Sequence, residues 1–184
     1  RHRPQVVHFS GHGSSAGELI LNSSEPGDIN PITAETLRRI FEPLTGDISC
    51  VVLNACYSAL QAKALAEILP CVVGMTNAVE DTAAVAFAAG FYEALAFGES
   101  VETAFKLGSA QIEIAQASVQ RDIPKMLLRS GTDAAHLRPF VLSAPVAEAK
   151  GASGPPRVLR LPKPRWLWNT IVVAVSLLAS GVGL

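Results

Sequence analysis

The chain has 184 residues, 49% of them hydrophobic, which is enough for one α/β domain with a full core and a small additional segment. Its formal net charge of −1 is divided unevenly, because residues 151–184 carry four basic side chains and no acidic one, which leaves −5 on the first 150 residues. A domain with this negative charge argues against a nucleic-acid partner. The three cysteines lack the spacing of a disulfide framework and fit a reducing compartment.

The first part of the chain predicts two strands and one helix. A continuous apolar run predicts a strand over residues 5–10, followed by a loop of small residues over 11–15. A shorter strand is predicted over 18–21, as one arm of a hairpin. A turn region is predicted over 22–31. Thr33 is placed to cap a helix whose apolar residues recur at helical spacing, namely Leu37, Ile40, Phe41 and Leu44.

The middle of the chain alternates strands with helices. Strands are predicted over 48–54 and 71–75, and helices over 59–69, 82–97 and 100–118. In the second of these helices the core residues are expected to be Val85, Phe87, Phe91 and Leu95. Residues 137–142, which include a proline, predict an edge strand. The alternation favours an α/β fold with a mostly parallel sheet that helices cover on both faces.

The C-terminal part differs in composition from the rest. Residues 147–165 are rich in proline, glycine and basic side chains and predict a linker. Residues 166–184 carry no charge, and as a helix they would extend about 28 Å, close to the ~30 Å hydrocarbon thickness of a bilayer. Trp166, Trp168 and the preceding basic residues predict a transmembrane helix with the domain before it in the cytoplasm. The alternative is a buried core helix.

Two short motifs suggest the chemistry. Ser10-Gly11-His12-Gly13 ends the first predicted strand, and Asn54-Ala55-Cys56 ends the strand over 48–54. The carboxyl ends of neighbouring parallel strands line the binding crevice of an open sheet, so this pattern predicts an imidazole beside a thiol. A thiol attacks as thiolate, and a neighbouring imidazole can take its proton and later deliver it to a leaving amine.

Backbone groups at the same positions are candidates for binding an oxyanion. The N–H groups of Gly13 and Cys56 are suitable donors, because a glycine lets a carbonyl oxygen approach closely. A helix predicted to follow Cys56 adds the field of its N-terminus. The chain contains no phosphate loop, zinc spacing or dinucleotide fingerprint, so no metal or cofactor is predicted.

The two motifs and their flanks resemble the caspase-like cysteine peptidases, and most closely their prokaryotic CHAT branch. The likeness covers about residues 4–143 and includes segments 17–21, 32–35, 77–81, 91–95 and 137–142. It implies a caspase-like three-layer α/β sandwich over residues 1–146 that hydrolyses peptide bonds with a dyad of His12 and Cys56. It also implies that the strands and helices of the family's N-terminal part precede Arg1 and are missing here.

Two further residues are candidates for substrate binding. The arginine- and lysine-specific relatives have an acid two residues before the cysteine, where this chain has the neutral Asn54, so a basic P1 preference is not carried over. The family often has an acid in the loop over 77–81, which makes Asp81 a candidate pocket residue. The alternative role for Asp81 is to cap the helix that follows.

Other residues of the same types have simpler interpretations. His8 is expected to be a packed strand histidine, since a strand would place it about 13 Å from His12, too far for one shared metal ion. Cys50 and Cys71 border strands and are expected to be inert small hydrophobic residues.

These observations favour a membrane-anchored cysteine endopeptidase with a protein or peptide substrate. The resemblance to caspase-like enzymes also implies control by a sensor or by oligomerisation. One alternative is a catalytically inactive caspase-like scaffold that signals by assembly. Another is an effector whose activity lies in the transmembrane segment over residues 166–184, which would contact the lipid bilayer.

Overall fold

A computed structural model describes residues 3–22, 29–115 and 118–140 of the chain. The predicted linker over 147–165 and the predicted transmembrane segment over 166–184 lie outside these described residues. Of the helices that the structure describes, none is both long enough and apolar enough to cross a bilayer.

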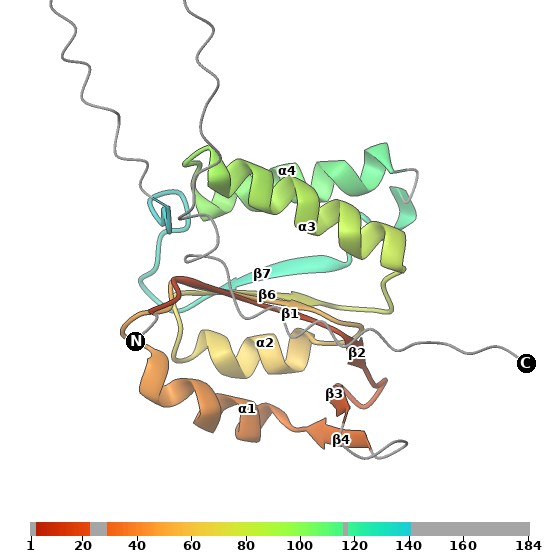
Figure 1. Ribbon diagram of the computed structural model, residues 1–184, viewed down its shortest axis with the longest axis vertical. Coiled ribbons are helices and arrows are strands. Elements are labelled where there is room, and N and C mark those ends of the chain that lie inside the picture. Colours follow the sequence, from red (N-terminus) through yellow and green to blue (C-terminus); the bar gives the residue numbers. More distant parts are fainter. Residues whose placement is uncertain (1–2, 23–28, 116–117, 141–184) are drawn as a thin grey trace, which may run out of the picture.

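The main sheet has four strands in the order β1-β5-β6-β7 (Figure 1). Strands β1 (Val6–Ser10), β5 (Cys50–Asn54) and β6 (Cys71–Met75) run parallel to one another. The edge strand β7 (Pro124–Leu128) is antiparallel to β6. Every residue of β5 and β6 is buried, which explains their continuous apolar runs. The predicted mostly parallel sheet is therefore confirmed.

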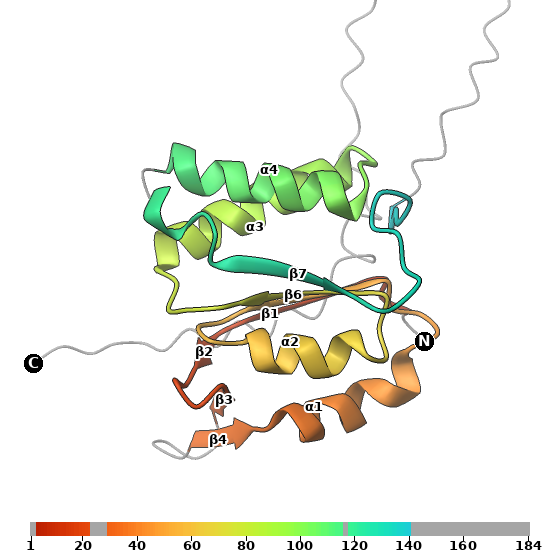
Figure 2. The same ribbon diagram turned by 180° about the vertical axis from the view of Figure 1, so that it is seen from behind.

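Helices cover both faces of this sheet (Figures 1 and 2). On one face lie α1 (Ala34–Phe41), which continues into a 3-10 turn over Glu42–Leu44, and α2 (Ala59–Ala66). On the other face lie α3 (Asp81–Ala96) and α4 (Val101–Ile114). The predicted cap Thr33 is confirmed, because its side chain accepts a hydrogen bond from the first turn of α1, and the side chain of Ser100 caps α4 in the same way.

Side chains along β5 point alternately to the two faces of the sheet and contribute to two separate cores. Cys50 and Val52 pack in the core shared with α3 and α4, where Phe87, Phe91 and Leu95 are also fully buried. Val51 and Leu53 pack in the opposite core, together with buried residues of α1 and α2. Because successive strand side chains point to opposite faces, one apolar run supplies both cores.

A second, smaller sheet stands beside the carboxyl end of β1. It consists of β2 (His12–Gly13), β3 (Leu19–Asn22) and β4 (Ile29–Ile32), all antiparallel. The prediction of a loop over 11–15 was therefore wrong for the β2 residues, and the predicted turn region over 22–31 extended too far. Both errors have one cause: these short strands are created by pairing with β3, whereas Gly13 in β2 and Asn30 and Pro31 in β4 favour turns.

The predicted edge strand was also misplaced. Residues 137–140 form no strand, and residues 141–142 lie outside the described part of the chain. The edge strand is β7, which begins with Pro124. A proline in a short run argues against a strand, but the first residue of an edge strand is a position where it is tolerated.

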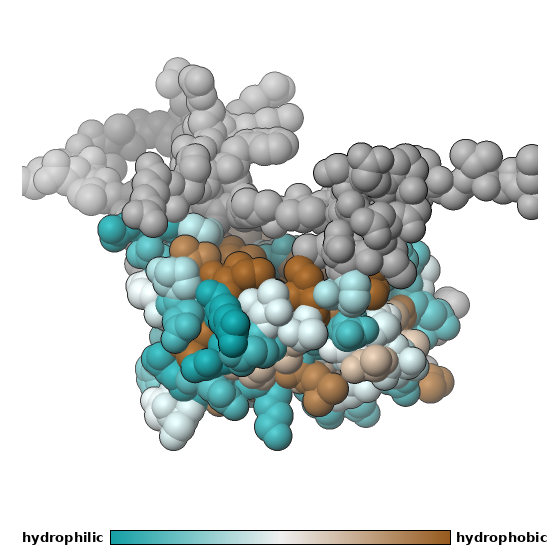
Figure 3. All heavy atoms as spheres, turned by 90° about the horizontal axis from the view of Figure 1, so that it is seen from below, coloured by the Kyte–Doolittle hydropathy of each residue, from teal (hydrophilic) through white to brown (hydrophobic). Residues whose placement is uncertain are grey.

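Some predicted core residues are exposed. In α3, Val85 is 68% exposed while Phe87 and Phe91 are fully buried. Two residues correspond to about 200° of rotation around a helix, which turns Val85 away from the sheet. Ile40, one of the apolar residues at helical spacing in the first predicted helix, is likewise 50% exposed, on the α1 side of the molecule. That face is mainly hydrophilic with separate hydrophobic patches (Figure 3).

His8 is a packed strand histidine, as predicted. Its Nδ1 atom lies 2.8 Å from the hydroxyl of Tyr92 on α3, and the two ring centroids are 5.4 Å apart. Burial lowers the pKa of His8 from 6.5 to about 4 and raises that of the Tyr92 phenol above its ordinary value. His8 is therefore neutral in the folded protein at neutral pH.

We expect this histidine to destabilise the fold in acid. His8 of the unfolded chain binds a proton as the pH falls below about 6.5, whereas His8 of the folded protein accepts a proton only near pH 4. Acid therefore favours the unfolded chain, and the free energy of unfolding falls between these two pH values by up to about 3 kcal/mol. Urea denaturation at pH 7.5, 6 and 5 measures the change. A His8→Gln variant should flatten the slope, whereas His136→Gln, which alters an exposed ring, should preserve it. An unchanged slope in His8→Gln would contradict the assignment.

Candidate active site

The strands β1 and β5 end level with each other at one edge of the main sheet. In their parallel register Ser10 faces Asn54, and the N–H of Gly11 donates a hydrogen bond to the Asn54 carbonyl at 3.4 Å. His12 and Cys56 each lie two residues beyond this last pair. The sequence thus places both predicted dyad residues immediately after the same pair of strand ends.

The segments that carry the two residues are in direct contact. A Cβ atom built on Gly13 would overlap the carbonyl oxygen of Cys56 and lie 2.9 Å from its carbonyl carbon. Strand β2 therefore lies against the backbone of Cys56 at a distance that only glycine allows. His12 is exposed and Cys56 is half-buried, so both are accessible from solvent at this edge.

In the structure the Cys56 thiol is engaged by Val79, in the loop between β6 and α3. The thiol donates to the Val79 carbonyl oxygen at 3.7 Å, and the Val79 N–H donates to Sγ at 3.4 Å. Within the described residues no hydrogen bond joins the thiol to the His12 ring. The thiol proton is therefore held by a backbone carbonyl in this arrangement.

The residues after Cys56 form a constrained turn. Tyr57 has φ = 55°, in the left-handed region that non-glycine residues rarely adopt, and its N–H donates to the Asn77 carbonyl at 3.2 Å. The buried Ser58 hydroxyl donates to the Leu53 carbonyl at 2.8 Å and accepts from the Met75 N–H at 2.9 Å. These bonds join β5, β6 and the start of α2, and they fix the position of Cys56.

The other two cysteines have a different environment. Cys50 and Cys71 are fully buried and face each other across β5 and β6. The hydrogen bond with the Cys71 thiol, together with burial, raises the pKa of Cys50 well above its ordinary value. Cys56 is therefore the one cysteine of the three that is not buried.

The two predicted substrate-binding residues lie near this edge in different surroundings. Asn54 is only 6% exposed, and its side-chain amide donates to the Ala84 carbonyl of α3 at 2.9 Å. Its Oδ1 atom has no hydrogen-bond partner among the described residues. Asp81 is exposed and is the first residue of α3. The cap of α3 is Glu80, so the alternative role of Asp81 as the cap was wrong.

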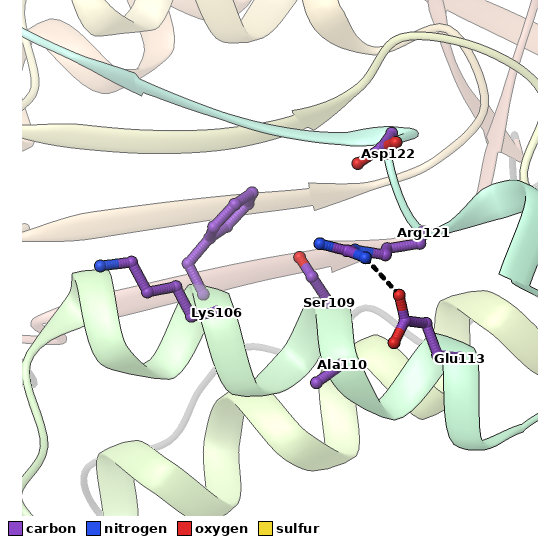
Figure 4. Close-up of a pocket in the computed structure, with 7 residues that line it drawn as sticks. Lys106, Ser109, Ala110, Glu113, Arg121 and Asp122 are labelled. Carbon is purple, nitrogen blue, oxygen red and sulfur yellow. Dashed lines mark hydrogen bonds and ion pairs between the residues drawn. The ribbon is translucent and has the colours of Figure 1, made fainter.

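A separate cavity of about 290 Å³ lies between α4 and the chain that leads into β7 (Figure 4). Its lining includes Phe105, Ser109 and Arg121, and Arg121 forms an ion pair with Glu113. None of the predicted site residues lines it. In the described part of the chain no group of three or more His, Cys, Asp or Glu side chains is arranged to hold a metal ion.

The sequence did not indicate two residues that shape the site. Val79 contacts the thiol through its backbone, and any residue type can supply a backbone N–H and C=O. Tyr57 adopts a positive φ that the surrounding fold imposes, and tyrosine is not a residue type that favours this conformation.

Comparison with known proteins agrees with this geometry. Residues 1–145 match the CHAT domain family. A protein named Roc-COR-CHAT protease, from an unknown prokaryotic organism, is 26% identical to this chain over 119 residues. The aligned region covers 61% of this chain but 11% of that protein.

Proposed function

The chain belongs to the CHAT domain family, within the caspase-like peptidases, and we propose that it is a cysteine endopeptidase whose dyad is Cys56 and His12. The observation that carries the proposal is the contact of Gly13 with the Cys56 backbone. This contact lies just beyond the point where the parallel strands β1 and β5 both end. This contact supports a short path between imidazole and thiol. The partial exposure of Cys56 adds support, because the two other cysteines are buried in the core.

The proposed reaction proceeds through an acyl-enzyme. His12 accepts the thiol proton, and the sulfur attacks the carbonyl carbon of the scissile peptide bond. The carbon–nitrogen bond then breaks, and the proton passes from His12 to the leaving amine. A water molecule gives a proton to His12 and attacks the thioester, which releases the acid and returns the proton to sulfur.

Backbone N–H groups are proposed to stabilise the tetrahedral oxyanion. The N–H of Cys56 has no hydrogen-bond acceptor among the described residues. The N–H of Gly13 is on a backbone that lies against Cys56. Two donors at one carbonyl position provide the preorganised electrostatic stabilisation that acyl transfer requires.

We propose that Asn54 and Asp81 contribute to the substrate pocket. Asn54 Oδ1 is a buried acceptor without a partner among the described residues, and such an acceptor is costly unless a ligand supplies a donor. Because Asn54 is neutral, the position two residues before the cysteine offers no negative charge to a basic P1 side chain. Asp81, exposed at the start of α3, would act at the rim.

Membrane anchoring by residues 166–184 is a further part of the proposal, with the peptidase domain on the cytoplasmic side. Its support is the uncharged 19-residue composition of this segment and the basic residues that precede it. Control by a sensor domain or by oligomerisation is proposed because caspase-like enzymes are usually controlled in one of these ways.

Labelling with a peptide electrophile tests the proposed dyad. We expect selective modification of Cys56 at neutral pH, at least ~10-fold slower in His12→Ala because the base that accepts the thiol proton is lost. His136→Ala, which removes an exposed histidine elsewhere, is the matched control and should label normally. Mass spectrometry identifies the modified cysteine.

Two outcomes would contradict the dyad. Equal labelling of Cys56 in the wild-type chain and in His12→Ala would mean that the imidazole does not act on the thiol. Equal reactivity of all three cysteines would favour a catalytically inactive scaffold.

A further inference from the structure

The loop that engages the Cys56 thiol is bound on two sides. We call residues 76–80, between β6 and α3, the thiol loop. On the side of the dyad, Val79 contacts Sγ through its N–H and its carbonyl, and the Asn77 carbonyl accepts a hydrogen bond from the Tyr57 N–H at 3.2 Å. These contacts make the thiol loop the immediate environment of the sulfur.

On its other side the thiol loop is fastened to residues 120–123, which lead into β7. The N–H and the hydroxyl of Thr76 both donate to the Ile123 carbonyl at 3.0 Å. The Glu80 N–H donates to the side-chain carbonyl oxygen of Gln120 at 2.8 Å. The Ile123 N–H in turn donates to the Gln120 backbone carbonyl at 3.0 Å, so the supporting segment is itself a closed turn.

The bond to Gln120 acts on the same peptide group that holds the thiol proton. The Glu80 N–H and the Val79 carbonyl belong to one peptide unit, which is planar and, as everywhere in the described chain, not cis. In a trans peptide the N–H and the C=O point in opposite directions. When Gln120 holds the N–H on one side, the carbonyl on the other side is fixed toward the sulfur of Cys56.

We propose that Gln120 is a positioning residue that decides which group receives the Cys56 proton. This inference rests on the proposed function, in which His12 must accept that proton. With Gln120 in place, the Val79 carbonyl competes with His12 for the S–H. Loss of the Gln120 bond frees the peptide unit to rotate and removes this competitor.

The test is the pH dependence of Cys56 alkylation by iodoacetamide in the full chain, with Cys50 and Cys71 sealed in the core. We expect Gln120→Ala to label two- to five-fold faster at pH 7, which is the change that loss of one hydrogen bond of ~0.5–1 kcal/mol gives. At high pH, where the sulfur is ionised in both proteins, the two labelling rates should be equal. The titratable groups around the thiol, His12, Glu80 and Asp81, are the same in both proteins.

Further variants separate positioning from a general structural role. Gln120→Glu keeps an oxygen that accepts the same N–H and should restore wild-type labelling. Glu80→Pro removes the donor together with the Glu80 carboxylate, and the Glu80 φ of −73° suits proline, so it should label faster than Glu80→Gln, which removes the carboxylate alone. Arg121→Ala removes the neighbouring ion pair to Glu113 without touching the thiol loop and should label normally.

Several results would overturn the inference. One is a Gln120→Ala protein that keeps the wild-type melting temperature but labels at the wild-type rate or more slowly. Another is a Gln120→Glu protein that does not return to the wild-type rate. If Gln120→Ala does not fold, Glu80→Pro decides in the same way. A chain that responds as expected but cleaves no peptide would refute the proposed function and leave the role of Gln120 intact.

Discussion

A Cys56→Ala variant is expected to hydrolyse peptides at least ~10³-fold more slowly than the wild-type chain, because the acyl-enzyme cannot form without the sulfur. His12→Ala should cause a loss of similar size, and the double variant should be little worse than either, since the two residues act as a unit. The measurement is a cleavage profile over a peptide library, followed by rates for one cleaved peptide.

The matched control for this prediction is Cys50→Ala, which makes the same change in a fully buried cysteine. It removes one buried sulfur atom from the core and is expected to lower the free energy of unfolding while leaving the rate per folded molecule unchanged. Thermal denaturation of all variants separates loss of fold from loss of chemistry. Cleavage of the same bonds by Cys56→Ala would show that the activity belongs to another site or to a contaminant.

The main sheet and its helices could be predicted because their signals are local. Buried parallel strands such as β5 and β6 are continuous apolar runs, and a buried run needs no partner to be recognised. Thr33 and Ser100 mark helix starts by a hydrogen bond within one turn. These features depend on residues that are close in sequence.

The strands that the sequence did not reveal depend on distant partners. Strand β2 has two residues, and its pairing with β3 is what makes it a strand. Strand β7 begins with proline and is recognisable as an edge strand only once β6 is beside it. Neither case offers a periodic pattern long enough to compete with turn-forming residues.

The candidate site divides in the same way. His12 and Cys56 are marked by residue type and by their positions after two apolar runs, so sequence reasoning could select them. Val79 and Gln120 could not be selected, because one acts through its backbone and the other is a polar side chain whose partner is 40 residues away. The proposed chemistry of the site can thus be inferred from the sequence, whereas the proposed role of Gln120 at the thiol cannot.

The second large effect is expected at Gly13, where the fold and the proposed chemistry depend on the same atoms. A Gly13→Ala methyl would overlap the Cys56 carbonyl oxygen, and backbone atoms on both sides leave no flexible side chain to move aside. Either β2 or the turn at Cys56 must shift, and a displacement of about 1 Å at a catalytic group can cost ~10²-fold in rate. We expect kcat/KM to fall by at least ~10²-fold.

Gly46→Ala is the control for this change, because a Cβ built there meets nothing within 4 Å and its backbone does not require glycine. It should retain wild-type hydrolysis and stability, so that any loss in Gly13→Ala reflects the contact and not the added methyl. Electrophile labelling of Cys56 in both variants adds a measurement that needs no substrate. If Gly13→Ala hydrolyses peptides and labels like the wild-type chain, β2 does not lie against Cys56 in the working protein. The path from imidazole to thiol would then lose its structural support, and a different base would have to be found for the sulfur.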